Sequence, residues 1–299
     1  MNKVKGIALI QVLLITALLT VFALFLNQGA QRHVHIATLA KQRAEAEVLM
    51  HSTKSDLFYA LLTEPLQYSS QKEIAQSEMT AVKEIKDKWN FHNQLFKISN
   101  YVSAKIQDQA SLVNINFMPT LRIQKLLTTN GVSPKRAKQI IDTLLDWLDT
   151  DNIARDFGRD SFLANDIRNG KIADITEIEK AISLTEDEKK LLYGNLSVFS
   201  RGDLNIISAS KELIASMSSI EKAQYVTKLR SEGKLTVTSF KEFTGIISED
   251  ELRYIPSRRL AVEIHVNYDD ISLSKKFVVK FSPYAQDPIP PYDLLLERN

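Results

Sequence analysis

The chain has 299 residues, of which 44% are hydrophobic and 25% are charged, and 38 Lys+Arg against 36 Asp+Glu leave a net charge of +2. This composition is typical of a globular protein, and the length suits two domains or one domain with a large insertion. The near-zero charge argues against a dedicated nucleic-acid binder. The absence of cysteine excludes thiolate metal sites, cysteine nucleophiles and disulfides. The motifs G-x-x-x-x-G-K-[ST], G-x-G-x-x-G and G-x-S-x-G are also absent, which leaves a nucleotide-dependent enzyme or a serine hydrolase without support.

A hydrophobic run from 7 to 26 opens the chain and is long enough to cross a bilayer as a helix. Three polar residues interrupt it, namely Gln11, Thr16 and Thr20. Two lysines and no acidic residue precede it, so the positive-inside rule predicts that residues 1–6 stay in the cytoplasm. We therefore expect a single-pass membrane protein whose bulk lies on the outer side of the membrane.

Three interpretations of this run compete. A secretory signal peptide has an apolar core of about 7 to 15 residues and an A-x-A-like cleavage site, but this core is longer and Gln28-Gly29-Ala30 fits poorly. A plain signal anchor is the second interpretation. In the third, Lys5-Gly6-Ile7 resembles a type IV prepilin leader, because a basic leader ends in glycine immediately before the apolar run. By that resemblance a prepilin peptidase cuts between Gly6 and Ile7 and methylates the new N-terminus.

Helical periodicity continues beyond the apolar run and favours the prepilin interpretation. Apolar residues recur at three-, four- and seven-residue spacings, at Ala30, Val34, Ala37, Ala44 and Val48. The first helix breaker is Pro65. We predict one helix over 7–62, about 84 Å long at 1.5 Å per residue. Its segment 7–26 would lie in lipid and its second half would pack on a globular head, whereas a plain anchor usually ends near the membrane.

Strand signals lie at both ends of the remaining chain. After a polar helical stretch from Gln71 to Lys88, alternating patterns occur around Gln94–Ser99 and Val102–Asp108. Near the C-terminus, 260–266 and 276–281 alternate around Asp269-Asp270, which predicts a β-hairpin. The proline-rich tail from Pro283 is predicted to be extended.

Between these strands, residues 113–256 show almost only helix signals. Ser133 with Pro134 predicts a helix start, and Thr185…Glu188 and Ser248…Glu251 read as capping boxes. A faint internal repeat is also present: 113–116, a helical run and a hairpin at 130–137 are matched by 204–206, 214–217 and 218–223. Both halves look like helix-hairpin-helix or SAM-like units.

Helix-hairpin-helix units can bind DNA when a glycine-rich turn presents backbone N–H groups to a phosphate. The first copy keeps only Gly131 and the second has no glycine in its turn. Residues 113–256 contain 20 Lys+Arg and 21 Asp+Glu, a net charge of −1, which is the wrong sign for a phosphate backbone. We therefore expect structural helix packing and no nucleic-acid partner.

The insertion holds the densest acidic cluster of the chain. Its members are Asp142, Asp146, Asp149, Asp151, Asn152, Asp156 and Asp160. Carboxylates from a helix end and the following loop can converge on calcium, which takes six to eight oxygen ligands. The cluster is not an EF-hand, because Ile153 and Ala154 occupy the fifth and sixth positions of a loop counted from Asp149. The alternative is a solvated acidic helix terminus, which the helix dipole disfavours unless a cation is present.

These motifs combine into one resemblance. In chain order they are the leader, Val113-Asn114-Ile115-Asn116, Leu145-Asp146-Trp147-Leu148-Asp149-Thr150-Asp151, Gly158-Arg159-Asp160, Asn169 with Asp174-Ile175-Thr176-Glu177-Ile178, and Leu204-Asn205-Ile206-Ile207-Ser208-Ala209. Together they resemble the type II secretion system protein K family, also called general secretion pathway protein K. The similarity runs through nearly the whole chain. Each motif alone is weak, but their order, with an insertion inside a pilin-like head, is specific to this family.

The resemblance implies an α+β fold with a long N-terminal transmembrane helix, a pilin-like head with antiparallel strands and an inserted all-α domain. The implied segments are a leader at 1–6, a helix at 7–62, a head made of 63–112 and 257–299, and an insertion at 113–256. Members are minor pseudopilins that lie in the inner membrane, project into the periplasm and assemble with the I and J minor pseudopilins at the pseudopilus tip. Some bind calcium, which here implicates Asp149, Asp151, Asp156 and Asp160.

The sequence thus predicts a non-enzymatic assembly protein that caps the pseudopilus and helps to initiate it for protein export across the outer membrane. Gln11 becomes the fifth residue after the Gly6 cut, where pilin-like subunits usually carry Glu and protein K members usually do not. The alternative function is a membrane-anchored periplasmic DNA receptor built on the helix-hairpin-helix repeat. Such a receptor would need neither the Lys5-Gly6-Ile7 leader nor a strand-rich head around the insertion.

Overall fold

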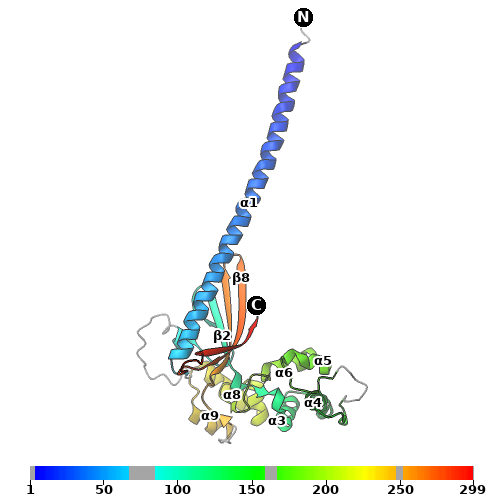
Figure 1. Ribbon diagram of the computed structural model, residues 1–299, viewed down its shortest axis with the longest axis vertical. Coiled ribbons are helices and arrows are strands. Elements are labelled where there is room, and N and C mark those ends of the chain that lie inside the picture. Colours follow the sequence, from blue (N-terminus) through cyan, green and yellow to red (C-terminus); the bar gives the residue numbers. More distant parts are fainter. Residues whose placement is uncertain (1–3, 67–84, 159–166, 247–251, 299) are drawn as a thin grey trace.

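A computed structural model describes residues 4–66, 85–158, 167–246 and 252–298, with side chains from Leu9 onward. One helix, α1 (Val4–Thr63), extends far beyond the rest of the protein, as Figure 1 shows. Its second half lies along a β-sheet, and a group of shorter helices lies at the end of the sheet opposite to the free half of α1 (Figure 1). The mixed fold with a long apolar helix and an antiparallel sheet confirms the fold class expected from the sequence.

The helix α1 runs uninterrupted for 60 residues and ends just before Glu64-Pro65, as the absence of earlier helix breakers predicts. The apolar positions that indicated this helix in the sequence are not the ones that pack on the sheet. Ala30, Val34, Ala37, Ala44 and Val48 are all exposed. The buried face carries Ala46, Met50, Leu57, Phe58, Ala60 and Leu61. Ala46 lies two residues after Ala44, and two residues turn a helix by about 200°, so the two faces point in nearly opposite directions.

The sheet has five antiparallel strands in the order β1-β2-β7-β8-β9. Their bounds are β1 Phe96–Lys97, β2 Val102–Asp108, β7 Arg259–Tyr268, β8 Ile271–Phe281 and β9 Tyr292–Arg298. The predicted hairpin is confirmed, because Tyr268 pairs with Ile271 across a two-residue turn in which Asp269 has φ 47°. The tail expected to be extended from Pro283 is extended only over β9, which pairs with β8 as an edge strand. The proline-rich part before β9 turns instead, with Ala285 N donating to Ser282 O and Ile289 N donating to Gln286 O. The helix predicted for 71–88 falls mostly outside the described residues.

Alternating side chains of the sheet face α1 and form one hydrophobic core with it. Val102, Ala104 and Ile106 of β2 are buried on one face, as their spacing predicts. The ring of Phe58 on α1 makes edge contacts with Phe281 at 5.4 Å and Tyr292 at 5.3 Å between ring centroids. Helix α1 is therefore held by both the central strands and the C-terminal strand.

The helical insertion leaves and rejoins the sheet at one point. Strands β2 and β7 are neighbours, and Asp108 at the end of β2 pairs with Leu260 near the start of β7. The insertion elements are β3 Val113–Asn114, α3 Thr120–Thr129, α4 Pro134–Leu148, α5 Ile178–Ala181, α6 Glu186–Asn195, β4 Leu196–Ser197, β5 Leu204–Asn205, α7 Lys211–Met217, α8 Ile220–Ser231, α9 Val237–Thr244 and β6 Leu252–Arg253. The two ends of the insertion therefore lie on neighbouring paired strands, and the insertion does not interrupt the sheet.

Helix starts inside the insertion follow the predicted signals. Ser133 caps α4 with Pro134 in its first turn, and Thr185 and Glu188 form a complete capping box on α6. Each cap satisfies backbone N–H groups that the first turn of a helix leaves free. The capping box expected at Ser248…Glu251 lies outside the described residues.

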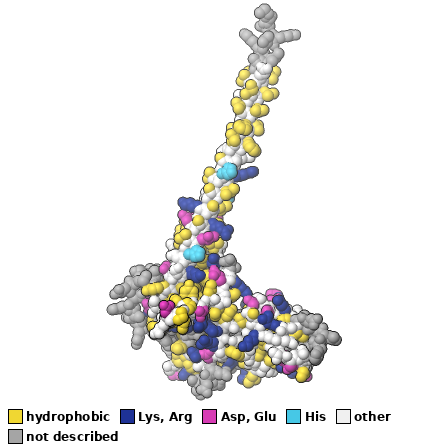
Figure 2. Space-filling view, in the orientation of Figure 1, with side chains coloured by type: hydrophobic (Ala, Val, Ile, Leu, Met, Phe, Trp, Pro, Cys, Tyr) yellow, Lys and Arg dark blue, Asp and Glu magenta, His cyan; other side chains and the backbone are white. Residues whose placement is uncertain are grey.

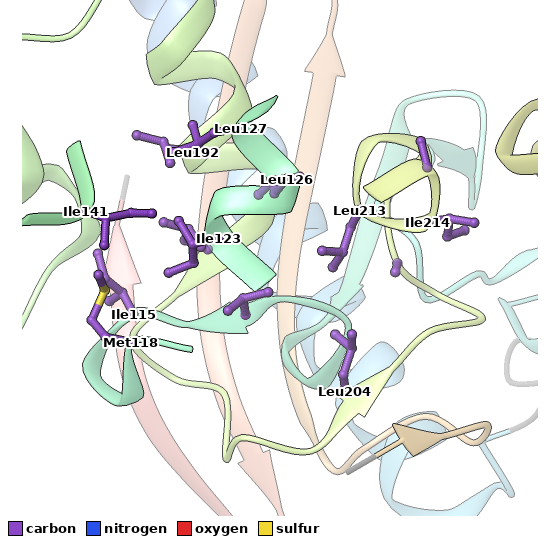
Figure 3. Close-up of a cluster of buried hydrophobic side chains, with 14 of the residues drawn as sticks. Ile115, Met118, Ile123, Leu126, Leu127, Ile141, Leu192, Leu204, Leu213 and Ile214 are labelled. Carbon is purple, nitrogen blue, oxygen red and sulfur yellow. The ribbon is translucent and has the colours of Figure 1, made fainter. Parts of the chain in front are cut away.

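The internal repeat has a structural counterpart. Strand β3 pairs in parallel with β4, and β5 pairs in parallel with β6, so each half opens and closes with strands that lie side by side. Helices α3 and α7, which follow the opening strands, pack against each other. Figure 3 shows side chains of both halves, among them Ile123, Leu126, Leu213 and Ile214, in one buried cluster.

Asp108 ties the insertion to the sheet. Its buried carboxylate accepts hydrogen bonds from Asn205 Nδ2 at 2.7 Å, Ser257 Oγ at 2.5 Å, Ser257 N at 3.1 Å and Ala110 N at 3.0 Å. Burial raises the pKa of this carboxyl, and the four donors act in the opposite direction. One side chain thus connects the exit from the sheet, the start of the second repeat and the return to the sheet.

Candidate metal site and membrane anchor

The predicted metal site lies where α4 ends. Apolar residues of α4, including Ile140, Leu144 and Trp147, enter the core of the insertion. Asp142 and Asp146 are also buried on this helix, which then ends at Asp149. Buried carboxylates need hydrogen-bond donors or cations, and the loop after Asp149 supplies them.

Arg155 neutralises one part of the cluster. Its Nη1 lies 2.5 Å from Asp146 Oδ1 and 2.6 Å from Asp149 Oδ2, and its backbone N donates to Asp146 Oδ2 at 3.2 Å. Hydrogen bonds to Asp149 and then Asp146 raise the pKa of the guanidinium. The Asp146 side chain is only 2% exposed, whereas the Arg155 side chain is 36% exposed, so the carboxylate is the buried partner of this pair.

Lys138 neutralises a separate part. Its Nζ lies 2.6 Å from Asp142 Oδ2 and 2.9 Å from Asp156 Oδ2, and it stands 5.0 Å from the centroid of the Phe157 ring. Hydrogen bonds to Asp142 and then Asp156 raise the pKa of the ammonium group. Neither Lys138 nor Arg155 was recognised from the sequence, although a base near each acidic pair was visible there.

The structure separates the three predicted ligands that it describes. Asp149 and Asp156 belong to different ion pairs, and Asp151 accepts a hydrogen bond from the backbone N of Ile153 at 2.9 Å. Asp160 lies outside the described residues. Within the described ranges, no three His, Asp or Glu side chains are placed to hold one metal ion.

Two buried oxygens nevertheless fit a calcium ligand set. In the part of the chain that the structure describes, Asp149 Oδ1 and Asn169 Oδ1 have no hydrogen-bond partner. Asn169 Nδ2 donates to Asp151 O at 3.4 Å and Asn152 Oδ1 at 3.3 Å, which brings its segment next to the loop after α4. Carboxylate, amide and carbonyl oxygens are the donors that calcium prefers. A cation here would be held by Asp149, Asn169 and the 151–152 segment, in competition with Arg155 for Asp149.

The first helix-hairpin-helix turn is also neutralised internally. Gly131 in this turn has φ 94°, a conformation that glycine adopts without strain. Arg136 follows in the first turn of α4, and its Nε and Nη2 donate to Glu188 at 2.8 and 2.9 Å. The Arg136 guanidinium lowers the pKa of Glu188. This arginine is therefore committed to a carboxylate of α6 rather than presented to a phosphate.

The free half of α1 has the properties of a membrane span. Every large hydrophobic side chain from Leu9 to Leu26 is at least 55% exposed, and Figure 2 shows this apolar surface along the projecting helix. By length and composition, this is the one described helix that could cross a membrane. Thr16 Oγ1 donates to Leu13 O at 2.9 Å and Thr20 Oγ1 donates to Thr16 O at 2.8 Å. Both hydroxyls thus have acceptors within the helix, as a lipid environment requires.

No protein-family model matches the chain, and no curated protein matches it in sequence. Among solved structures, it is similar to a chain in the crystal structure of the GspK-GspI-GspJ complex from the enterotoxigenic Escherichia coli type 2 secretion system. The similarity has a TM-score of 0.54 at 13% sequence identity and covers 86% of this chain and 96% of that chain. It confirms the resemblance to protein K at the level of fold, and the chain has a GspK-like architecture.

Proposed function

We propose that this protein is a minor pseudopilin of a type II secretion system, anchored in the inner membrane with its bulk in the periplasm. One observation carries the proposal: the GspK-like fold continues over 86% of the chain while the apolar half of α1 is left exposed. In such a subunit the exposed half lies in lipid and the remainder presents a folded head. The protein has a structural role, and no enzymatic step is part of the proposal.

The proposal includes a tip location and the help of partners. The matched structure is a complex of GspK with GspI and GspJ, and we propose other minor pseudopilins of the I and J type as partners. The bulky insertion lies at the end of the head opposite to the free half of α1 (Figure 1). A subunit of this shape would fit the end of the filament. There it would help to start assembly, and no further subunit would have to stack above it.

Processing of the leader tests the proposal. We expect N-terminal sequencing of membrane-extracted protein to begin at Ile7, with mass spectrometry showing one added methyl group. Gly6→Val should block cleavage, because the peptidase would meet a branched side chain at the cut. Gly29→Val is the matched control, since no atom lies within 4 Å of a Cβ at this position. An unprocessed wild-type chain, or one that begins beyond residue 25, contradicts the proposal.

Co-purification tests the partners separately. When the chain is expressed with I-type and J-type minor pseudopilins of its own secretion system, a stable complex is expected in detergent extracts. Loss of the gene should also stop export of folded proteins through the outer membrane. A processed protein that neither binds these subunits nor affects export would contradict the assembly role while leaving the membrane topology intact.

The DNA-receptor alternative predicts saturable, salt-sensitive binding of duplex DNA. The pairing of Arg136 with Glu188 commits one of the two basic side chains that follow the hairpin turn to a carboxylate. We therefore expect negligible DNA affinity at physiological salt. A fluorescence titration with submicromolar affinity would favour the receptor instead.

We also propose that the loop after α4 binds calcium as a structural ion. Two unpartnered oxygens, on Asp149 and Asn169, support this site, and Asp151, Asp156 and Asp160 are the other residues implicated by the family resemblance. Calcium would add positive charge to the acidic loop, where the single positive charge of Arg155 pairs with Asp146 and Asp149 in its absence.

A further inference from the structure

A basic cavity lies where the insertion meets the sheet. Its volume is about 350 Å³, and three segments that are distant in the sequence surround it. The segment 199–203 links the two halves of the insertion, 253–259 returns the chain to the sheet, and Lys280 and Phe281 come from β8. Neither the acidic loop nor the membrane helix contributes to it.

The cavity walls carry a large excess of positive charge. The basic side chains are Arg201, Arg253, Arg258, Arg259 and Lys280, and the one carboxylate among the lining residues is Asp203. Asp203 pairs with Arg253, and Asp293 pairs with Lys280 at 2.9 Å. Asp108 touches the lining residue Ser257 but accepts hydrogen bonds from its own four donors. Arg201, Arg258 and Arg259 are thus left without a carboxylate among the described residues.

The two adjacent arginines, Arg258 and Arg259, are fixed by main-chain carbonyls. Arg258 Nη1 donates to Leu61 O at 3.0 Å, and Arg259 Nη1 donates to Phe199 O at 2.9 Å. The buried Arg259 Nε has no hydrogen-bond partner among the described residues. Burial lowers the pKa of both guanidinium groups, the charge of Arg201 lowers the pKa of Arg259 further, and the carboxylate of Asp293 acts in the opposite direction. Arginine remains protonated in proteins, so a bound anion would reduce the repulsion between Arg201 and Arg259.

We propose that this cavity is an oxyanion-binding site that takes a phosphate group or a carboxylate. Guanidinium groups bind both anions through paired, charge-assisted hydrogen bonds. Arg201 and Arg259 would bind the anion from two different segments, and its negative charge would offset the repulsion between them. Because Arg201 belongs to the insertion and Arg258 and Arg259 belong to the return to the sheet, a bound anion joins these two parts. The site is independent of the pseudopilin function and of the calcium site.

Isothermal titration calorimetry tests the site on the full chain in a non-ionic detergent at constant ionic strength. Inorganic phosphate and glutarate are the two probes, and saturable binding in the millimolar range or tighter is expected. Arg201→Gln should raise the dissociation constant about tenfold, the effect of losing one charge-assisted contact. Arg201 is exposed and has no ion pair in the described parts of the chain, so this variant should fold. Arg43→Gln removes the same charge from an exposed position on α1 and serves as the control.

Thermal unfolding gives a second readout. Phosphate should raise the melting temperature of the wild type and of Arg43→Gln, and at the same concentration should raise that of Arg201→Gln and Arg259→Gln clearly less. If both probes bind, the cavity is an oxyanion site that also accepts carboxylates. If only phosphate binds, the natural ligand carries a phosphate group. Absence of saturable binding for both probes, or equal binding by Arg201→Gln and Arg43→Gln, overturns the proposal.

Discussion

Arg155 decides the chemistry of the acidic loop at the residue scale. It holds Asp146 and Asp149 together without a metal, and Lys138 does the same for Asp142 and Asp156. A calcium ion at the orphaned oxygen of Asp149 would have to share this carboxylate with the guanidinium. A stronger ion pair between Arg155 and Asp149 should therefore lower the affinity of the loop for calcium.

This opposition leads to a prediction about calcium. We expect calcium to raise the melting temperature of the wild type, because a ligand that binds only the folded state stabilises it. In Arg155→Gln the melting temperature should fall without calcium, since the buried Asp146 carboxylate loses its ion pair with the guanidinium, and the gain on adding calcium should grow. Differential scanning fluorimetry with calcium and with chelator measures both effects. Lys138→Gln is the control, and identical melts for wild type and Arg155→Gln in both conditions would eliminate the site.

Gly158 is constrained by the same side chains. A Cβ at this position would overlap Asp146 Oδ2, which is buried and ion-paired with Arg155. We predict that Gly158→Ala lowers the free energy of unfolding by about 1–3 kcal/mol, the usual cost of overpacking. At Gly170 the nearest atom to a Cβ would be Arg168 O at 3.8 Å, so Gly170→Ala is the matched control. Urea unfolding compares the two variants, and equal stabilities would contradict this packing argument.

His92 predicts a pH dependence of stability. Burial, and then the charge of Arg230, lower its pKa from 6.5 to about 4 in the folded protein. The unfolded chain therefore takes up a proton between pH 6.5 and 4 that the folded chain refuses. The free energy of unfolding should fall as the pH falls through this window, by up to about 1.4 kcal/mol per unit.

The contribution of His92 is separated from that of other groups by substitution. In His92→Gln the decline between pH 6.5 and 4 should become shallower than in the wild type. His51→Gln, at an exposed position on α1, should leave the decline unchanged. Denaturant unfolding at several pH values measures these slopes, and parallel profiles for wild type and His92→Gln would refute the assignment.

At the scale of elements, α1 combines two environments in one continuous helix. Its first half exposes apolar side chains, and its second half buries a different face against β7 and β8. No breaker separates the halves, so the position of the head is set relative to the membrane by a stiff helix.

The packed half of α1 should dominate the stability of the head. Leu57 is fully buried on α1, and we predict that Leu57→Ala lowers the free energy of unfolding by about 2–5 kcal/mol. Val48 is 67% exposed, so Val48→Ala should change it little. Guanidinium unfolding of the detergent-solubilised protein compares them. Similar losses for both variants would contradict the observed packing of α1 on the head.

At the scale of the whole molecule, the size of the insertion limits how copies can stack. The insertion is large, and it projects from the end of the head opposite to the free half of α1 (Figure 1). Gln11, within the apolar run, supplies no carboxylate, and a carboxylate in lipid costs several kcal/mol unless it is paired. Both features favour a terminal position, where no further subunit has to be accommodated.

We therefore predict few copies per filament and an end location. Quantitative mass spectrometry of sheared pseudopili should find this chain far below the major subunit, and immunogold labels should lie at filament ends. The major subunit, counted in the same samples, is the internal standard. Labels along the shaft in amounts that match the major subunit would refute the tip assignment.

Local spacing in the sequence was sufficient for several features. The length of α1, the hairpin around Asp269-Asp270 and the caps at Ser133 and Thr185 were predicted from residues that lie close together in the chain. Each depends on interactions between neighbours or on the absence of a breaker, so the sequence by itself determined them. The exposed run from Leu9 to Leu26 belongs to the same group, because its length and composition suffice.

Other features were decided only by the tertiary structure. Periodicity shows that α1 has apolar faces, but only the position of the sheet selects the face with Met50 and Leu57 over that with Val48. The acidic cluster was visible, whereas its partition between Arg155 and Lys138 depends on how the loop after α4 folds back on the helix. The basic cavity draws on segments as far apart as 199–203 and Lys280. Charges and faces that meet through long-range contacts have no periodic signal, because chain folding rather than chain spacing brings them together.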